Sequence, residues 1–207
     1  MLRRTTGRLL LILIVITGSA GTIVNNSISK PDRKYALSIM KDSQKELTKA
    51  TKGLSTAQQD FKAAPDRWSV RECVYHIAAS EKRLWSIFEE AMKNAPAPEK
   101  RKEIRIKDEE LVIMAQDRSK KNQAPESLRP DNAGYKNMAE ALADFKISRQ
   151  DHIRYMRTST EDMRNRVVQL AFGWIDCYQL YIFIAAHSKR HIAQLQEVQA
   201  AAGYPKK

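Results

Sequence analysis

The sequence contains few of the residues that interrupt helices. It has only seven glycines and seven prolines among 207 residues, and long stretches contain neither. Because glycine and proline mark turns and loops, their scarcity favours an all-α fold. The sequence also lacks internal repeats and low-complexity tracts, and its length suits one domain with a complete hydrophobic core. We therefore expect a single helical domain.

An apolar run at residues 9–16 follows three arginines, and no cysteine comes directly after it. The missing cysteine excludes a lipoprotein anchor. Gly18 and Ala20 are small residues with the spacing of a signal-peptidase site. The run is also shorter than the roughly 20 residues of a membrane-spanning helix. These features favour a cleaved signal peptide, and a retained N-terminal membrane anchor is the alternative.

The expected organisation is a signal peptide or anchor over residues 1–20, a linker over 21–32 and a helical domain over 33–207. An exported chain of this kind would work outside the cytoplasm of a bacterium, in the periplasm or beyond it. Contact with a membrane is expected only through an uncleaved leader.

The formal net charge is +12, but no basic stripe interleaved with aromatic residues is present. Basic residues alternate with acidic ones, as in the segments 99–103 and 107–110. Nucleic-acid binding, which such a stripe would indicate, is therefore not expected. A small-molecule substrate of unknown identity is the expected partner.

Hydrophobic periodicity and capping signals predict four long helices. The first begins at Pro31 and ends at Gly53, and the second begins at the capping box Ser69–Glu72 and stops before Pro96. The third spans about Asn137 to Arg157, and the fourth begins near Asp176 and ends at Gly203. The long stretch between the second and third helices is charged, contains a short helix over 109–116, and fits a bundle with one long crossover. Residues 158–175 form a second connection.

Two of the four histidines, His187 and His191, lie four residues apart in an apolar stripe of the fourth helix. Such side chains are neighbours on a helix, roughly 5–6 Å apart at Cβ, close enough to hold one metal ion. His76 falls on the inward face of the second helix. Because a buried polar group without a partner is costly, three inward imidazoles from two packed helices indicate a metal site.

Three histidines with open coordination positions are typical of a catalytic zinc site. Nickel, manganese and iron also accept imidazole, so the sequence does not fix the divalent metal. The alternative is that the histidines are ordinary core residues with hydrogen-bond partners. Ser188 follows His187 where a His-Glu-x-x-His peptidase would carry its glutamate base, which excludes a peptidase of that kind.

The two cysteines, Cys73 and Cys177, are not expected to form a disulfide. If His76 lies level with His187 and His191, the cysteines lie one and about three turns from that level. Their axial separation is then at least roughly 13 Å, whereas a disulfide needs Cα atoms within about 7 Å.

Two further residues are candidates for acid–base catalysis. Glu72 lies four residues before His76 and could orient that imidazole, although its capping-box role is the favoured interpretation. His152 falls on the inward face of the third helix, where a proton shuttle and an ordinary core histidine are the alternatives. Arg149 and Arg190 are candidates for binding an anionic substrate, although Arg190 faces away from the histidines.

The chain from about residue 34 to 204 resembles the DinB/YfiT-like metalloenzymes. The resemblance is carried by Pro65–Glu72 leading to His76, by the segments 108–130, 145–149 and 173–178, and by the terminal Ala186–Gln194. It implies a four-helix bundle in up-down-down-up order, often a homodimer. It also implies a divalent metal, commonly zinc or nickel, held by residues that match His76, His187 and His191.

These observations support a metal-dependent hydrolase or transferase as the leading functional hypothesis. Some proteins of the family are thiol transferases, which gives one alternative, although an exported protein would not meet cytosolic thiol cofactors. The other alternative is a non-catalytic exported binding or structural protein, which would need no general base. The sequence identifies neither the substrate nor the base.

Overall fold

The computed structural model describes residues 28–121 and 123–206. Four long helices dominate it: α1 (Lys30–Thr51), α3 (Val70–Lys93), α5 (Met138–Thr158) and α6 (Cys177–Gln199). The all-α fold class is thereby confirmed, and α1 begins within the stretch expected to be the linker. The predicted signal peptide or anchor over residues 1–20 lies outside the described residues. None of the described helices combines the length and the apolar character needed to cross a membrane.

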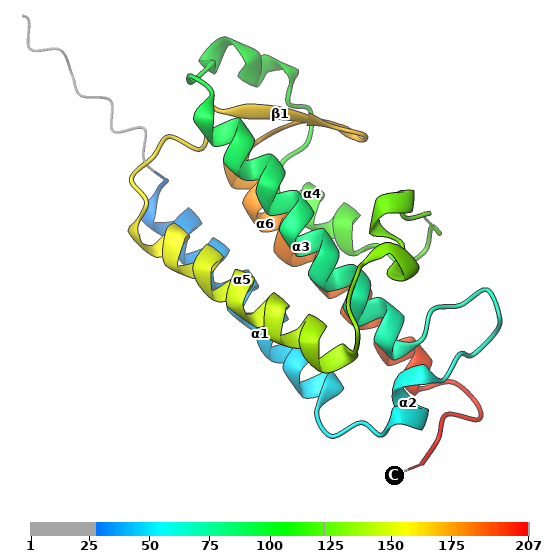
Figure 1. The fold of residues 1–207 in the computed structure, drawn as a ribbon. Coiled ribbons are helices and arrows are strands. Elements are labelled where there is room, and N and C mark those ends of the chain that lie inside the picture. The colour runs from blue at the N-terminus through cyan, green and yellow to red at the C-terminus, as the bar shows by residue number, and fades with distance from the viewer. Residues whose placement is uncertain (1–27, 122, 207) are drawn as a thin grey trace, which may run out of the picture.

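The helices form a bundle in up-down-down-up order (Figure 1). Helices α1 and α6 run in one direction, and α3 and α5 run in the other. Each long helix packs against its parallel neighbour and against one antiparallel helix, in the cyclic order α1, α6, α3, α5. Because α3 and α5 are parallel neighbours, the chain must return along the whole bundle between them. This requirement explains the long crossover.

The crossover carries four short elements. These are η1 (Pro98–Glu103), α4 (Asp108–Gln116), η2 (Glu126–Leu128) and η3 (Pro130–Asn132). Helix α4 is the short helix that the sequence predicts, and it packs against α6. The crossover therefore adds a partial outer layer on the face of α6 that the bundle leaves open.

The long helices begin at side-chain caps. Ser29, Asn137 and Asp176 cap α1, α5 and α6, and Ser69 caps α3 in a complete capping box. Each cap satisfies backbone N–H groups that lack a partner within the first turn. The four predicted helix starts are thus confirmed to within a residue.

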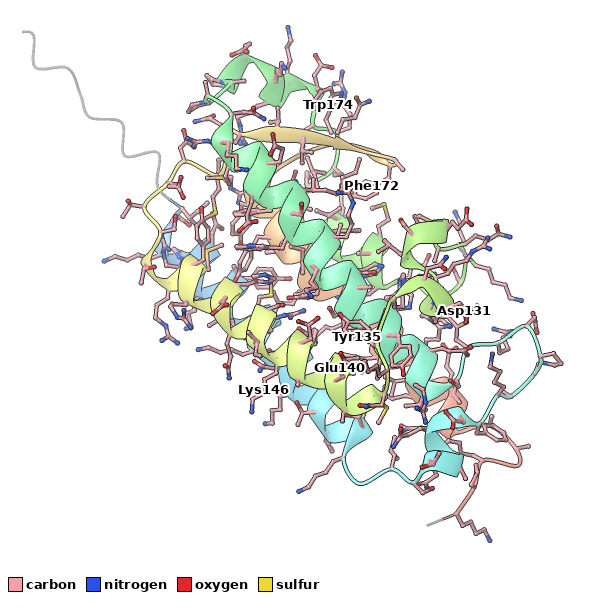
Figure 2. The ribbon with its side chains drawn as sticks, viewed as in Figure 1. Asp131, Tyr135, Glu140, Lys146, Phe172 and Trp174 are labelled. Carbon is pink, nitrogen blue, oxygen red and sulfur yellow. The ribbon has the colours of Figure 1, made fainter. Side chains whose placement is uncertain are left out.

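Some local features differ from the prediction. Helix α6 ends at Gln199, and the positive φ of 81° at Gly203 belongs to the turn that follows. The connection after α5 contains an antiparallel hairpin of β1 (Val167–Leu170) and β2 (Gly173–Asp176), with Phe172 exposed at its tip (Figure 2). Strands of four residues are too short for an alternating pattern to stand out from a loop.

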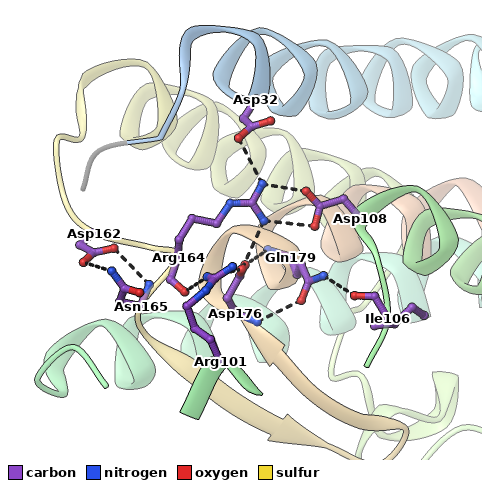
Figure 3. A network of polar contacts seen from close by, with 9 residues as sticks. All are labelled: Asp32, Arg101, Ile106, Asp108, Asp162, Arg164, Asn165, Asp176 and Gln179. Carbon is purple, nitrogen blue, oxygen red and sulfur yellow. Dashed lines mark hydrogen bonds and ion pairs between the residues drawn. The ribbon is translucent and has the colours of Figure 1, made fainter. Parts of the chain in front are cut away.

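A partly buried ionic network joins the hairpin to the starts of three helices (Figure 3). The guanidinium of Arg164 contacts the carboxylates of Asp32 at 3.2 Å, Asp108 at 2.7 Å and Asp176 at 3.2 Å. Asp32, Asp108 and Asp176 lie in or at the first turns of α1, α4 and α6. One arginine therefore fixes one end of the bundle.

The apolar core consists of two clusters. One surrounds Phe88, Met156 and Tyr181 toward the hairpin, and the other surrounds Val74, Phe145 and Leu195 toward α2 (Thr56–Asp60). Along the four long helices, polar residues lie at the level between the two clusters. The members of this middle layer are Ser43, His76, Ser80, Glu81, Arg149, His152, Ser188 and His191, which are buried, and His187, which is half-buried.

Candidate metal centre

The structure brings together the three histidines that the sequence singles out. His76 comes from α3, and His187 and His191 come from α6. One nitrogen from each ring lies within 4.8 Å of the other two. The ring centroids of His76 and His191 are 4.3 Å apart, and those of His187 and His191 are 4.6 Å apart. Nitrogens this close can share one cation.

Hydrogen bonds fix the orientation of two of the rings. Nδ1 of His76 lies 2.8 Å from the carbonyl oxygen of Leu128, and Nδ1 of His191 lies 2.9 Å from Oε1 of Gln194. Because these oxygens can only accept, each Nδ1 donates, and the lone pair of each ring is on Nε2. A metal-binding histidine usually donates its second N–H to such a partner. The two rings are therefore in the tautomer that offers Nε2 to a cation.

The environment keeps the three rings neutral. Burial lowers the pKa of His76 and lowers that of His191 well below its ordinary value. Burial, together with the charges of His76 and Arg190, lowers the pKa of His187 to about 3. Neutral imidazole is the form that binds a metal. At neutral pH no proton has to leave these nitrogens before a cation binds.

Aromatic side chains cover the cluster. The ring of Trp68 lies 4.9 Å from that of His76 and stacks on His191 at 5.8 Å, and Phe183 lies 5.9 Å from His187. Within the described part of the chain, no carboxylate or thiol joins the three histidines. The donor set is therefore three neutral nitrogens. Such a set suits a divalent cation of intermediate hardness, and it does not neutralise the charge of that cation.

Glu72 serves the helix start. Its carboxylate accepts hydrogen bonds from the backbone N–H of Ser69 at 2.7 Å and from Nζ of Lys62 at 2.6 Å. This is the capping-box role that the sequence favours. The partner that orients His76 is the Leu128 carbonyl, which lies on η2 in the crossover.

His152 lies apart from the three-histidine group, in the same middle layer. Its ring is buried, stacks on Trp85 at 3.8 Å, and contacts Oε1 of Glu81 through Nδ1 at 2.8 Å.

Glu81 also pairs with Arg149, whose side chain is fully buried. Arg149 is thus no surface site for an anionic substrate, contrary to that candidate role. Arg190 donates to the backbone carbonyl of Lys120.

The cysteines are both free, as predicted, and both are buried. Burial raises the pKa of the Cys73 thiol, and burial and the nearby Asp176 raise that of Cys177 to about 12. Thiols held in the protonated form are poor nucleophiles and poor metal ligands. This agrees with their absence from the histidine group.

Sequence reasoning missed three residues that support the site: Leu128, Gln194 and Glu81. Leu128 acts through its backbone, so no side-chain pattern could identify it. Gln194 follows His191 by three residues, which places it on the same helix face. Glu81 falls on the apolar stripe of α3 between Ile77 and Leu84, and a charge in such a stripe is the signal that could have identified it.

Comparisons with known proteins agree with this architecture. The sequence profile of the DinB superfamily matches residues 39–195. Uncharacterized protein YuaE of Bacillus subtilis (strain 168) is 27% identical over 164 residues, which are 79% of this chain and 96% of YuaE.

A solved structure shares the fold. YfiT from Bacillus subtilis, described as a probable metal-dependent hydrolase with an unusual four-helix bundle topology, matches with a TM-score of 0.60 and 19% identity, over 86% of this chain and 92% of YfiT. Since the superfamily profile covers well over half of the sequence, the chain belongs to the DinB superfamily.

Proposed function

We propose that this protein is a metal-dependent enzyme, most simply a hydrolase, in which His76, His187 and His191 hold one divalent cation. The observation that carries the proposal is the approach of three neutral imidazole nitrogens within 4.8 Å inside the bundle. The likeness of the fold to YfiT, described as a probable metal-dependent hydrolase, supports it. Zinc and nickel are the proposed metals, with manganese and iron as alternatives.

A divalent cation held by three protein ligands keeps an open position, and there it lowers the pKa of bound water from near 16 to about 7. The residues of this chain supply the setting for that chemistry. Leu128 and Gln194 hold the imidazole rings, and Trp68 shields the rings of His76 and His191 from water. The three neutral ligands leave the positive charge of the cation undiminished, which favours an acidic bound water.

Metal analysis of purified protein tests the binding step. We expect about one equivalent of divalent metal in the wild type and its loss in His76→Ala, His187→Ala and His191→Ala. His152→Ala is the matched control because it removes the remaining histidine, which lies outside the cluster. Equal metal content in all four variants and the wild type would refute the assignment.

Activity assays separate the proposed hydrolase from the alternatives. Metal-loaded protein is tested with p-nitrophenyl acetate, and with monochlorobimane in the presence and absence of a low-molecular-weight thiol. Metal-dependent ester cleavage supports a hydrolase, and turnover that requires the added thiol indicates a thiol transferase. Unfolding of the protein on removal of the metal, without turnover, indicates a structural ion in a non-catalytic protein.

We also propose that the protein acts outside the cytoplasm on a small molecule and not on nucleic acid. The basic and apolar N-terminal sequence and the interleaved surface charges support this proposal. Cell fractionation with N-terminal sequencing of the recovered protein tests the location and the processing. Recovery of an uncleaved chain in the cytoplasm would refute it. A homodimer, which the family resemblance implies, is tested by sedimentation.

A further inference from the structure

The guanidinium of Arg149 makes a complete set of hydrogen bonds in the middle of the bundle. Its Nε and Nη2 donate to the two carboxylate oxygens of Glu81 at 2.7 and 2.5 Å. The other three bonds go to Oγ of Ser43 at 2.5 Å, the carbonyl oxygen of Met40 at 3.2 Å and Oγ of Ser188 at 2.9 Å. An arginine has five N–H donors, and all five are used.

These contacts connect all four long helices. Arg149 lies on α5, Glu81 on α3, Ser188 on α6, and Met40 and Ser43 on α1. Since the side chain is fully buried, water cannot replace a partner that moves away. The relative positions of the helices at this level are therefore set by one rigid, planar group.

Two of the contacts adjoin the candidate metal ligands. Ser188 directly follows His187, and Glu81 lies five residues after His76, about 7.5 Å along the axis of α3. The two ligands on α6 are held relative to each other by their own helix. The position of His76 relative to them depends on how α3 sits against α6. The connection Glu81–Arg149–Ser188 joins these two helices next to the site.

A metal site is sensitive to this position. Metal–nitrogen bonds are about 2.0–2.1 Å long and tolerate deviations of about 0.2 Å. Apolar side chains can slide against each other with little change in buried area, whereas two-pronged hydrogen bonds between a guanidinium and a carboxylate cannot. The apolar clusters bring α3 and α6 together, but a directional contact is needed to fix their register.

Stability alone is a weak reason for such a network. A buried ion pair is often no more stabilising than apolar residues of similar volume. We infer that Arg149 is a positioning residue for the metal centre: it fixes α6 against α3 and thereby holds His187 and His191 at ligand distance from His76. This inference rests on the proposed metal binding.

The test compares two serines that give Arg149 the same kind of contact. Ser188 lies on the helix that carries two ligands, whereas Ser43 lies on α1, which carries none. Cobalt(II) alone is titrated into the full chain, and its visible d–d absorption reports both affinity and coordination geometry. For Ser188→Ala we expect a dissociation constant raised by about threefold to tenfold, the equivalent of one lost hydrogen bond, and an altered spectrum. For Ser43→Ala we expect a change of less than about twofold and an unchanged spectrum.

A second pair separates positioning from general loss of stability. Arg149→Met is compared with Arg164→Met, which removes the ionic network at the hairpin end of the bundle. The Asp176 partner of Arg164 lies eleven residues before His187, about 16 Å along α6. At temperatures where both variants are folded by circular dichroism, we expect only Arg149→Met to weaken cobalt binding by tenfold or more.

The outcomes distinguish failure of the positioning role of Arg149 from failure of the proposed metal binding. If the wild type binds cobalt and Ser188→Ala binds it with unchanged affinity and spectrum, the positioning role is wrong while the metal centre stands. Equal weakening in Ser188→Ala and Ser43→Ala, or in the two arginine variants, would also overturn it, because the effect would then reflect stability. If the wild type itself binds no cobalt, the proposed function fails, and the positioning role fails with it.

Discussion

Replacement of Glu81 by glutamine tests how strongly the middle layer depends on charge. Glu81 is 1% exposed. Its two carboxylate oxygens accept hydrogen bonds from Nε and Nη2 of Arg149, and one of them also contacts Nδ1 of His152. The amide of Glu81→Gln has nearly the same shape, but it turns an NH2 group toward N–H donors and leaves the arginine charge without a counter-ion. Removal of one partner from a buried ion pair costs about 3–5 kcal/mol.

The expected loss is large enough to measure by two methods. In a domain of this size, each kcal/mol changes the melting temperature by about 2–4 °C, so the expected decrease for Glu81→Gln is about 6–20 °C. Urea unfolding at neutral pH measures the free energy directly. The control is Glu46→Gln, which makes the same chemical change in an ion pair with Lys189 at 2.9 Å. The Glu46 side chain is 43% exposed, so the expected loss there is about 0–1 kcal/mol.

The pH dependence gives the same experiment a second readout. Burial alone would raise the pKa of Glu81, but the charge of Arg149 and the hydrogen bonds from His152 and Arg149 lower it below its ordinary value. A carboxyl whose pKa is lower in the folded state stabilises the fold above its unfolded pKa of about 4.3 and loses that contribution as the pH falls through the folded value. The difference in stability between wild type and Glu81→Gln should therefore be constant at neutral pH and shrink in acid.

Two results would refute this reasoning. The first is a loss for Glu81→Gln no larger than that for Glu46→Gln at neutral pH, which would mean that breaking the buried pair costs no more than breaking an exposed one. The second is a difference that persists unchanged below pH 4, which would mean that the charge of Glu81 is not the cause.

Three further predictions follow from individual contacts. Ser69→Ala removes the cap of α3 and should destabilise the fold by about 0.5–2 kcal/mol in urea unfolding; no measurable loss would contradict the capping role. Gln194→Met removes the acceptor that orients His191 and should weaken cobalt binding by about tenfold to a hundredfold with little change in melting temperature, and unchanged affinity would contradict it. Because burial raises the pKa of Cys73 and Cys177, both thiols should react with a disulfide reagent only after denaturation; rapid labelling of the native protein would show that they are accessible.

Much of the fold could be predicted from the sequence because its signals are local. The capping box at Ser69 and the caps at Asn137 and Asp176 place the helix starts, and each depends on side chains within one turn. The hairpin of β1 and β2 was not predicted because its strands are short and its pairing depends on the turn around Gly173, whose φ is 132°. The end of α6 was placed too late because Gly203 marks the turn after the helix and not its last residue.

The candidate site was predictable only in part, for a related reason. His187 and His191 are related by helical spacing, and the inward face of His76 follows from the stripe of α3. The group that orients His76 is a backbone carbonyl at Leu128, 52 residues further along the chain, and no side-chain pattern reports it. The structural role of Arg149 has no signal in the sequence because its partner Glu81 lies on another helix, and a long-range pair leaves no spacing in the sequence.

The positions of the charged pair and the histidine group within the bundle also bear on the chemistry. Both lie in the middle layer between the two apolar clusters, and Ser188 belongs to the network of Arg149 while its neighbour His187 belongs to the histidine group. If Glu81 were left without Arg149, a buried carboxylate without a counter-ion would act electrostatically on His187 and on a cation held there. The pairing of Glu81 with Arg149 keeps that carboxylate engaged, so that a cation bound by the histidines retains its full charge. Metal-bound water in Arg149→Met should therefore be less acidic than in the wild type, and the pH dependence of the cobalt spectrum should shift upward; a downward shift would contradict the argument.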